Sequence, residues 1–242
     1  MGVETQIIEP VSVHILLVRR IGSYLLRYAT WWLSVAWFCI YNSSSLVRLP
    51  HALAFVRLLF QVRHTGMMPE DCHRLLLWRA ACLPFGDGHI VEVGSYEGGS
   101  AVYLAKPMSL NDDPYMLFCV DTFTGYAGNE DSLSKFWKNI RRVGVSSRVI
   151  AIQNTSVDAA AGWTNGLIRL LFIDALHTLE GVRSDFESWS PFVVEGGGVM
   201  FHDYDTKHPA VKQYVDELVA GRKITPLVTL PSMLLARITR PD

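Results

Sequence analysis

The 242-residue chain has few cysteines, almost no net charge and no lysine before residue 86. Its four cysteines are scattered among apolar neighbours, without the spacing of a metal site or a disulfide framework. Reduced thiols of this kind are typical of the cytoplasm, which is where we expect the protein to be. The net charge of -1 leaves no electrostatic footprint for nucleic acid, so we expect no nucleic-acid partner.

The charges that are present divide the chain into two parts. Residues 1–85 contain eight arginines and four acidic residues, so their net charge is 8 − 4 = +4 and that of the remainder is −1 − 4 = −5. A loop rich in proline and glycine, residues 84–88, separates the two parts. We predict a helical hydrophobic extension over residues 1–85 and an α/β domain over residues 86–242.

The extension contains an uncharged stretch, residues 28–47, whose core at residues 31–41 is rich in tryptophan. A membrane-spanning helix needs ~20 mostly apolar residues, and this stretch reaches that length only by including the polar residues 42–45. Residues 24–62 therefore have three possible roles. The first is a set of helices packed on the α/β domain or on a second subunit of a homo-oligomer. The second is attachment to a membrane interface, which would anchor the protein at the membrane periphery, and the third is a membrane span.

From residue 89 onward, short apolar runs alternate with amphipathic stretches, which predicts a Rossmann-like doubly wound α/β fold. The last two runs are joined by a tight turn at Leu230-Pro231, so the last strand is expected to be antiparallel. A turn at residues 195–198 is expected to precede the fifth strand. The seven predicted strands are 89–93, 115–120, 148–153, 168–173, 198–201, 224–229 and 232–238.

A glycine-rich turn follows the first predicted strand, between Glu92 and Ser100. Glycine adopts dihedral angles that other residues avoid, so the backbone can approach a ligand closely there. The helix that follows offers unpaired N–H groups to an anionic or polar ligand. The spacing Gly94-x-x-x-Gly98 differs from Gly-x-Gly-x-x-Gly, which argues against a nicotinamide-dependent dehydrogenase.

Polar residues also follow the other predicted strands, where an open α/β sheet binds its ligands. Asp121 ends the second strand, 27 positions after Gly94, and its carboxylate could accept both hydroxyls of a ribose. The alternative is a helix cap or turn aspartate. Thr155 and Ser156 follow the third strand, where they would contact an adenine or cap the next helix.

Asp174 follows a fully apolar strand and begins the sequence Asp174-Ala-Leu-His177-Thr-Leu-Glu-Gly-Val182. With the glycine turn and His202-Asp203-Tyr204, this segment resembles class I S-adenosylmethionine (SAM)-dependent methyltransferases. The similarity is to the branch of macrocin O-methyltransferase-like and cephalosporin-hydroxylase-like proteins, and it covers about residues 89–205.

The resemblance implies transfer of a methyl group from SAM to a hydroxyl, with Asp174, His177 and Asp203 as catalytic residues. The acceptor would be a sugar-containing or lipid-linked small molecule, such as a glycolipid or a glycosylated natural product. The alternative is a SAM-binding partner or scaffold subunit without activity, at a membrane. The implied SAM-binding residues are Glu92, Gly94, Ser95, Tyr96, Gly98, Ser100, Asp121, Thr122, Thr155, Ser156 and Asp174.

The resemblance also implies a divalent metal, often Mg²⁺, held by Asp174, His202 and Asp203. Relatives often carry an acidic pair where this chain has His202-Asp203, and a second acid where it has Leu176. Because Mg²⁺ disfavours imidazole ligands, we expect either a softer ion or no metal.

Overall fold

A computed structural model describes residues 49–62, 71–125 and 131–239. The chain divides into two compact units between Val56 and Arg57, within helix α2 (Leu49–Gln61). The predicted tryptophan-rich stretch at residues 31–41 lies outside the described residues. Within the described ranges, no helix combines the length and the apolar character that crossing a bilayer requires.

The second unit is built on a seven-stranded sheet with the order β3-β2-β1-β4-β5-β7-β6. Among these strands, β7 alone runs opposite to the others, which confirms the predicted fold class. The strands are β1 (His89–Val93), β2 (Leu117–Asp121), β3 (Val149–Gln153), β4 (Ile168–Ile173), β5 (Val193–Tyr204), β6 (Ile224–Leu230) and β7 (Ser232–Ile238).

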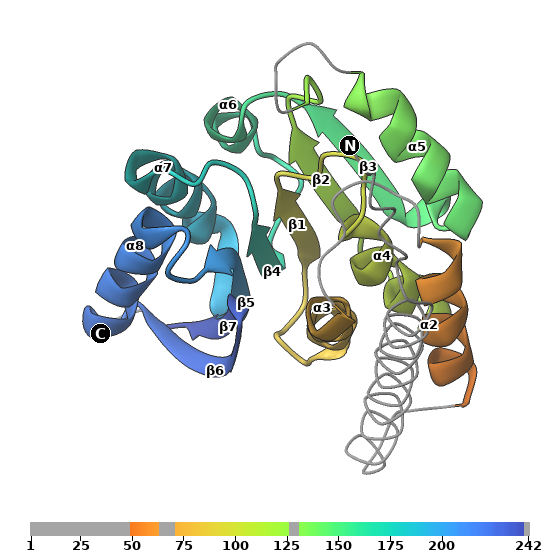
Figure 1. The fold of residues 1–242 in the computed structure, drawn as a ribbon, viewed down its shortest axis with the longest axis horizontal. Coiled ribbons are helices and arrows are strands. Elements are labelled where there is room, and N and C mark those ends of the chain that lie inside the picture. Colours follow the sequence, from red (N-terminus) through yellow and green to blue (C-terminus); the bar gives the residue numbers. More distant parts are fainter. Residues whose placement is uncertain (1–48, 63–70, 126–130, 240–242) are drawn as a thin grey trace, which may run out of the picture. The chain divides into compact units, whose positions relative to one another are not determined.

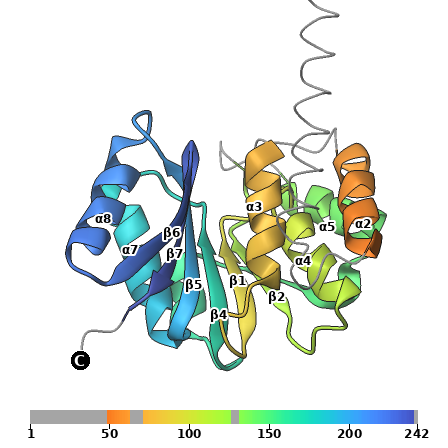
Figure 2. The ribbon, with the colours of Figure 1, turned by 90° about the horizontal axis from the view of Figure 1, so that it is seen from below.

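Helices cover both faces of this sheet (Figures 1 and 2). One face carries α3 (Asp71–Cys82), α4 (Ala101–Leu110) and α5 (Ser132–Val143), and α3 packs against α4. The other face carries α6 (Ser156–Ala161), α7 (Leu179–Trp189) and α8 (Pro209–Ala220). All six residues of β4 are buried, as expected for a parallel strand covered on both faces.

The start of β5 differs from the prediction. The glycine run at residues 195–198 was expected to be a turn before the strand, but β5 begins at Val193 and contains it. Ile168 pairs with Val193 whereas Leu170 pairs with Gly198, so the extra residues form a bulge. A Cβ on Gly198 would lie 2.7 Å from the ring of Phe85, which explains a glycine inside the strand.

Candidate active site

The glycine turn lies where the order of the parallel strands reverses. The connections from β1 lead to β2 and β3 on one side, and β4 and β5 lie on the other. Open α/β sheets bind their ligands beyond the carboxyl ends of the strands at this reversal. The turn after β1, Asp121 after β2, Asp174 after β4 and Asp203 near the end of β5 share that edge of the sheet.

Gly94 is required by close packing of backbone against backbone. Its φ angle is +88°, and a Cβ there would lie 2.0 Å from the carbonyl oxygen of Asp174. Gly98 has a φ angle of +80°, and its Cβ would lie 2.9 Å from the ring of Phe136 in α5. Both positions of the motif therefore allow the turn to sit tightly between β4 and α5.

Glu92 supports the turn from the side of the core. Its side chain is fully buried, and it accepts hydrogen bonds from the hydroxyls of Ser95, at 2.8 Å, and Ser100. The thiol of Cys119 in β2 lies 3.3 Å from the same carboxyl group. Burial raises the pKa of Glu92 to about 7, although the three hydrogen bonds lower it. The side chains of Glu92, Ser95 and Ser100, all predicted to bind SAM, thus hold the turn together.

Asp121 connects the turn to β2. Its Oδ2 accepts the backbone N–H groups of Ser95, at 2.9 Å, and Tyr96, at 2.8 Å, and its Oδ1 accepts that of Phe123 at 2.6 Å. A carboxylate has about four acceptor positions, so one remains for a ligand hydroxyl in this conformation. Tyr96 has a φ angle of +44°, which is uncommon for a residue other than glycine. In this conformation its backbone N–H donates to Asp121.

The remaining predicted cofactor residues follow β2 and β3. Thr122 is exposed, and its backbone carbonyl accepts a hydrogen bond from Gln153 at 3.2 Å. Thr155 is the N-cap of α6, because its hydroxyl accepts the N–H of Asp158. Ser156 does not cap this helix. Its hydroxyl accepts the indole N–H of Trp189 in α7 at 3.1 Å.

Asp203 is directed into a cluster of imidazole rings by an irregularity in β5. The register between β5 and β7 shifts between His202 and Tyr204, and Asp203 has a φ angle of +55°. A bulge of this kind re-aims side chains near the end of a strand. Aspartate tolerates the left-handed conformation better than most residues do.

The carboxylate of Asp203 is surrounded by three histidines. Its Oδ2 lies 2.7 Å from Nε2 of His177 and 3.1 Å from Nδ1 of His202, and its Oδ1 lies 3.3 Å from Nδ1 of His208. Nδ1 of His202 is also 3.2 Å from Oδ1 of Asp174. The structure therefore brings together the predicted catalytic residues and the predicted metal ligands.

The charges of this cluster reinforce one another. The carboxylate of Asp203, 2.7 Å away, raises the pKa of His177 against the opposing effect of burial. Burial lowers the pKa of His202, but Asp174 and Asp203 outweigh it and raise this pKa to about 10. Burial raises the pKa of Asp203, and the two imidazoles outweigh it and hold that pKa well below its usual range. At neutral pH His202 is therefore an imidazolium group beside the carboxylate of Asp203.

Two histidines near the cluster were missed from the sequence. His208 precedes α8, and the run Asp203-x-Asp205-x-x-His208 at a strand end was the available signal. His73 belongs to α3, within the predicted extension, and no motif distinguishes it. Its ring centroid lies 5.2 Å from that of His202, and its Nε2 contacts the carbonyl of Pro231.

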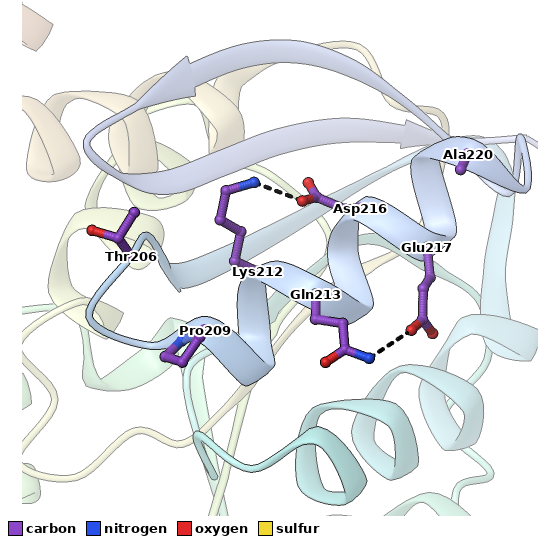
Figure 3. Close-up of a pocket in the computed structure, with 7 residues that line it drawn as sticks. All are labelled: Thr206, Pro209, Lys212, Gln213, Asp216, Glu217 and Ala220. Atoms are coloured by element: carbon purple, nitrogen blue, oxygen red, sulfur yellow. Dashed lines mark hydrogen bonds and ion pairs between the residues drawn. The ribbon is translucent and has the colours of Figure 1, made fainter.

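A hollow along the outer side of α8 does not belong to the site (Figure 3). Two pairs of its lining residues bond to each other: Lys212 with Asp216 at 2.6 Å and Gln213 with Glu217 at 3.0 Å. None of the clustered histidines and aspartates lines it. The strand ends, rather than this hollow, therefore hold the chemistry.

The central part of the chain resembles a known kind of domain. Residues 91–204 match a family model described as a methyltransferase domain. The matched segment, 114 of the 242 residues, is similar to that domain. The matched segment contains the glycine turn, Asp121 and all of the cluster except His208.

Curated relatives resemble the chain over about half of its length. An uncharacterised protein of Sinorhizobium fredii is 29% identical over 139 residues, which are 55% of this chain and 15% of that protein. An uncharacterised protein of Acanthamoeba polyphaga mimivirus is 31% identical over 143 residues, 54% of this chain and 61% of that protein. The chain thus spans less than two thirds of either relative.

Solved structures share the fold at low sequence identity. The O-methyltransferase NovP has a TM-score of 0.64 and 17% identity, with 79% of this chain and 99% of that chain covered. An O-methyltransferase from Bacillus cereus in complex with SAH has a TM-score of 0.57 and 15% identity, with 77% and 90% covered. This likeness shows the fold that the chain shares with these proteins.

Proposed function

We propose that the protein is a SAM-dependent O-methyltransferase acting on a hydroxyl of a small molecule. The observation that carries this proposal is the position of the Asp174–Asp203 cluster on the same sheet edge as the glycine turn. The turn and Asp121 would hold SAM, and the cluster would face the acceptor. Binding of SAM and placement of a hydroxyl beside it would then use adjacent parts of one site.

Methyl transfer forms an oxygen–carbon bond, breaks the sulfur–carbon bond of the sulfonium and releases the hydroxyl proton. The acceptor oxygen must lie in line with the departing sulfur, and a nearby base must take the proton. Two carboxylate–imidazole pairs are available: Asp203 with His177, at 2.7 Å, and Asp174 with His202, at 3.2 Å. We propose that Asp174, His177 and Asp203 surround the hydroxyl and that either the neutral imidazole of His177 or the carboxylate of Asp174 accepts its proton.

The surroundings of the cluster favour an acceptor with an apolar part. Leu176, which precedes His177 in the chain, is 66% exposed and so offers an apolar surface next to that histidine. The uncharged residues 28–47 would bring the domain to a membrane surface. We therefore propose a lipid-linked or glycolipid hydroxyl as the acceptor.

Calorimetric titration of SAM into the purified full chain tests the cofactor. We expect micromolar binding that Asp121→Asn weakens at least tenfold, because the amide cannot accept the N–H groups of Ser95 and Tyr96 through both of its terminal atoms. Asp216→Asn is the control, since Asp216 lies on the exposed side of α8. The absence of SAM binding by a folded wild-type chain would refute the proposal.

A second assay separates an enzyme from a SAM-binding protein without activity. Methyl transfer from radiolabelled SAM is measured on extracted lipids and on water-soluble glycosides, with the wild type and Asp174→Ala. The proposed enzyme labels an acceptor, and the variant does not. SAM binding without transfer to any acceptor class would instead favour the inactive partner or scaffold subunit.

A further inference from the structure

The donor atoms of the cluster do not suit the Mg²⁺ ion that the family resemblance implies. Mg²⁺ prefers oxygen ligands in an octahedron, usually carboxylates and waters. Here three imidazole rings, from His177, His202 and His208, lie around Asp203. Imidazole nitrogen suits first-row transition ions such as Zn²⁺ and Fe²⁺.

The direction of the ring nitrogens is the second observation. Nε2 of His177 is buried and lies 2.7 Å from Oδ2 of Asp203, yet it finds no hydrogen-bond partner within the described parts of the chain. A separation of 2.7 Å is short enough for a hydrogen bond, so the bond is absent because the ring nitrogen and the carboxylate oxygen are poorly aligned. Nδ1 of His202 is in the same situation at 3.1 Å and 3.2 Å from its two carboxylates. A buried polar atom without a hydrogen-bond partner is a group that a bound ion or water would satisfy.

Two sets of three residues have ligand atoms close enough to share an ion. One set is His177, Asp203 and His208, and the other is Asp174, His202 and Asp203. Ligand atoms about 2.1 Å from one ion lie about 3.0–3.4 Å from each other, and His208 approaches Asp203 at 3.3 Å. The two rings of the first set are also neighbours, with centroids 4.8 Å apart.

The carboxylate of Asp205 approaches the same nitrogen of His208. Nδ1 of His208 contacts Oδ1 of Asp205 at 3.1 Å, and that oxygen also accepts the backbone N–H groups of Lys207 and His208. The other oxygen of Asp205 accepts the hydroxyl of Ser232. Nδ1 of His208 thus lies between two carboxylates, and as a ligand it would exchange its contact with Asp205 for the ion.

We propose that His177, Asp203 and His208 bind one first-row transition ion of the Zn²⁺ class, and that Mg²⁺ does not occupy this site. The three ligands come from three elements: the loop after β4, the bulge in β5 and the residue before α8. With His177 as a ligand, the carboxylate of Asp174 remains to accept the proton of the acceptor. The proposal deepens the proposed function and rests on it only for that last step.

The test uses the full chain, stripped of metal with a chelator and then titrated with Zn²⁺, Mg²⁺ and Co²⁺. We expect one Zn²⁺ per chain, no displacement by millimolar Mg²⁺, and visible absorption bands from bound Co²⁺ that report nitrogen ligands. His177→Ala and His208→Ala should each weaken Zn²⁺ binding about 100-fold. Asp216→Asn is the control, because Asp216 lies on the outer side of α8, the helix that His208 precedes, and this variant should leave the Zn²⁺ affinity unchanged.

Three results would overturn the proposal. One is a folded wild-type chain that binds no stoichiometric Zn²⁺. Another is Zn²⁺ binding that Asp174→Ala abolishes while His177→Ala and His208→Ala retain it, which would assign the ion to the other set. The third is equal competition by Mg²⁺. SAM titration of the same samples reports on the proposed function separately, since the predicted cofactor site at Asp121 lies outside this ligand set.

Discussion

At the scale of single residues, the turn after β1 depends on a carboxyl group that faces away from the ligand side. The motif places an acid two positions before Gly94, and the structure shows that this acid, Glu92, is fully buried and bonded to Ser95 and Ser100. Such a group stabilises the turn while carrying the cost of its own burial. Its protonation is therefore linked to folding.

Glu92 makes stability depend on pH. Its pKa is about 7 in the folded protein and 4.5 ordinarily, so the folded state binds more protons between these values. The free energy of unfolding therefore falls as pH rises from about 4.5 to 7, by up to about 1.4 kcal/mol per pH unit from this group. We expect Glu92→Gln to remove this part of the slope, measured by urea unfolding at pH 5, 6, 7 and 8.

The control for this measurement is Glu180→Gln, because Glu180 is exposed in the first turn of α7. Its pH dependence should match that of the wild type. If the difference in stability between the wild type and Glu92→Gln stays constant from pH 5 to pH 8, Glu92 does not retain its proton as described.

Comparing alanine substitutions at Gly94 and Gly144 distinguishes the cost of backbone strain from the cost of a steric conflict. Both have positive φ angles, +88° and +71°, but a Cβ on Gly144 meets nothing within 4 Å. Gly144→Ala should cost about 1–2 kcal/mol, the strain of a left-handed residue. Gly94→Ala adds a conflict at 2.0 Å with the carbonyl oxygen of Asp174, so we expect a loss above about 3 kcal/mol and no SAM binding. Similar losses of unfolding free energy in the two variants would contradict this interpretation.

At the scale of elements, neighbouring helices are tied together by polar groups beneath the surface. Ser156 in α6 accepts the indole N–H of Trp189, a fully buried residue of α7. The carboxylate of Asp185 in α7 is buried, which raises its pKa, and Ser156 lowers it in part. The position of Ser156 was compatible with an adenine contact or a helix cap, and its hydroxyl instead faces α7.

Substitution of Ser156 distinguishes a structural role from cofactor binding. Ser156→Ala leaves the Trp189 N–H without this acceptor, so we expect a loss of about 1–3 kcal/mol in urea unfolding and a SAM dissociation constant within twofold of the wild type. Thr155→Ala should cost about 1 kcal/mol through loss of the cap. A tenfold weaker SAM affinity in Ser156→Ala would assign Ser156 to the cofactor site.

At the scale of the whole molecule, the described part of the first 85 residues combines two kinds of surface. Helix α3 is joined to the domain, since it packs on α4 and His73 reaches Pro231 in the β6–β7 turn. In α2, the apolar residues Leu53 and Phe60 are 60% and 54% exposed, and Arg57 is exposed between them. Exposed apolar residues beside arginine suit a membrane interface.

Membrane attachment is testable by sedimentation with lipid vesicles. We expect the full chain to pellet with vesicles of phosphatidylglycerol and phosphatidylcholine, and less with phosphatidylcholine alone, because its first 85 residues carry a net charge of 8 − 4 = +4. A chain beginning at residue 49 should pellet less, since it lacks the uncharged stretch 28–47. Full-length protein that stays in the supernatant with both lipids would contradict the proposed attachment.

The sequence by itself determined the order of strands and helices and the positions of the glycine turn, Asp121 and Asp174. These follow from local causes: apolar alternation, turn residues and the end of an apolar run. The bounds of β1, β4 and β7 agree with the prediction. The roles of the predicted site residues in binding and catalysis remain predictions.

Only the tertiary structure decided which groups meet at the strand ends. His208 reaches the carboxylate of Asp203 where β5 bulges, and His73 lies beside His202 because α3 packs on α4. Neither the bulge nor the packing of α3 has a local signature. The glycine run at residues 195–198 became a bulge rather than a turn because β4 pairs with both of its flanks. Side-chain direction depends on such long-range pairing, which residue spacing along one chain segment does not contain.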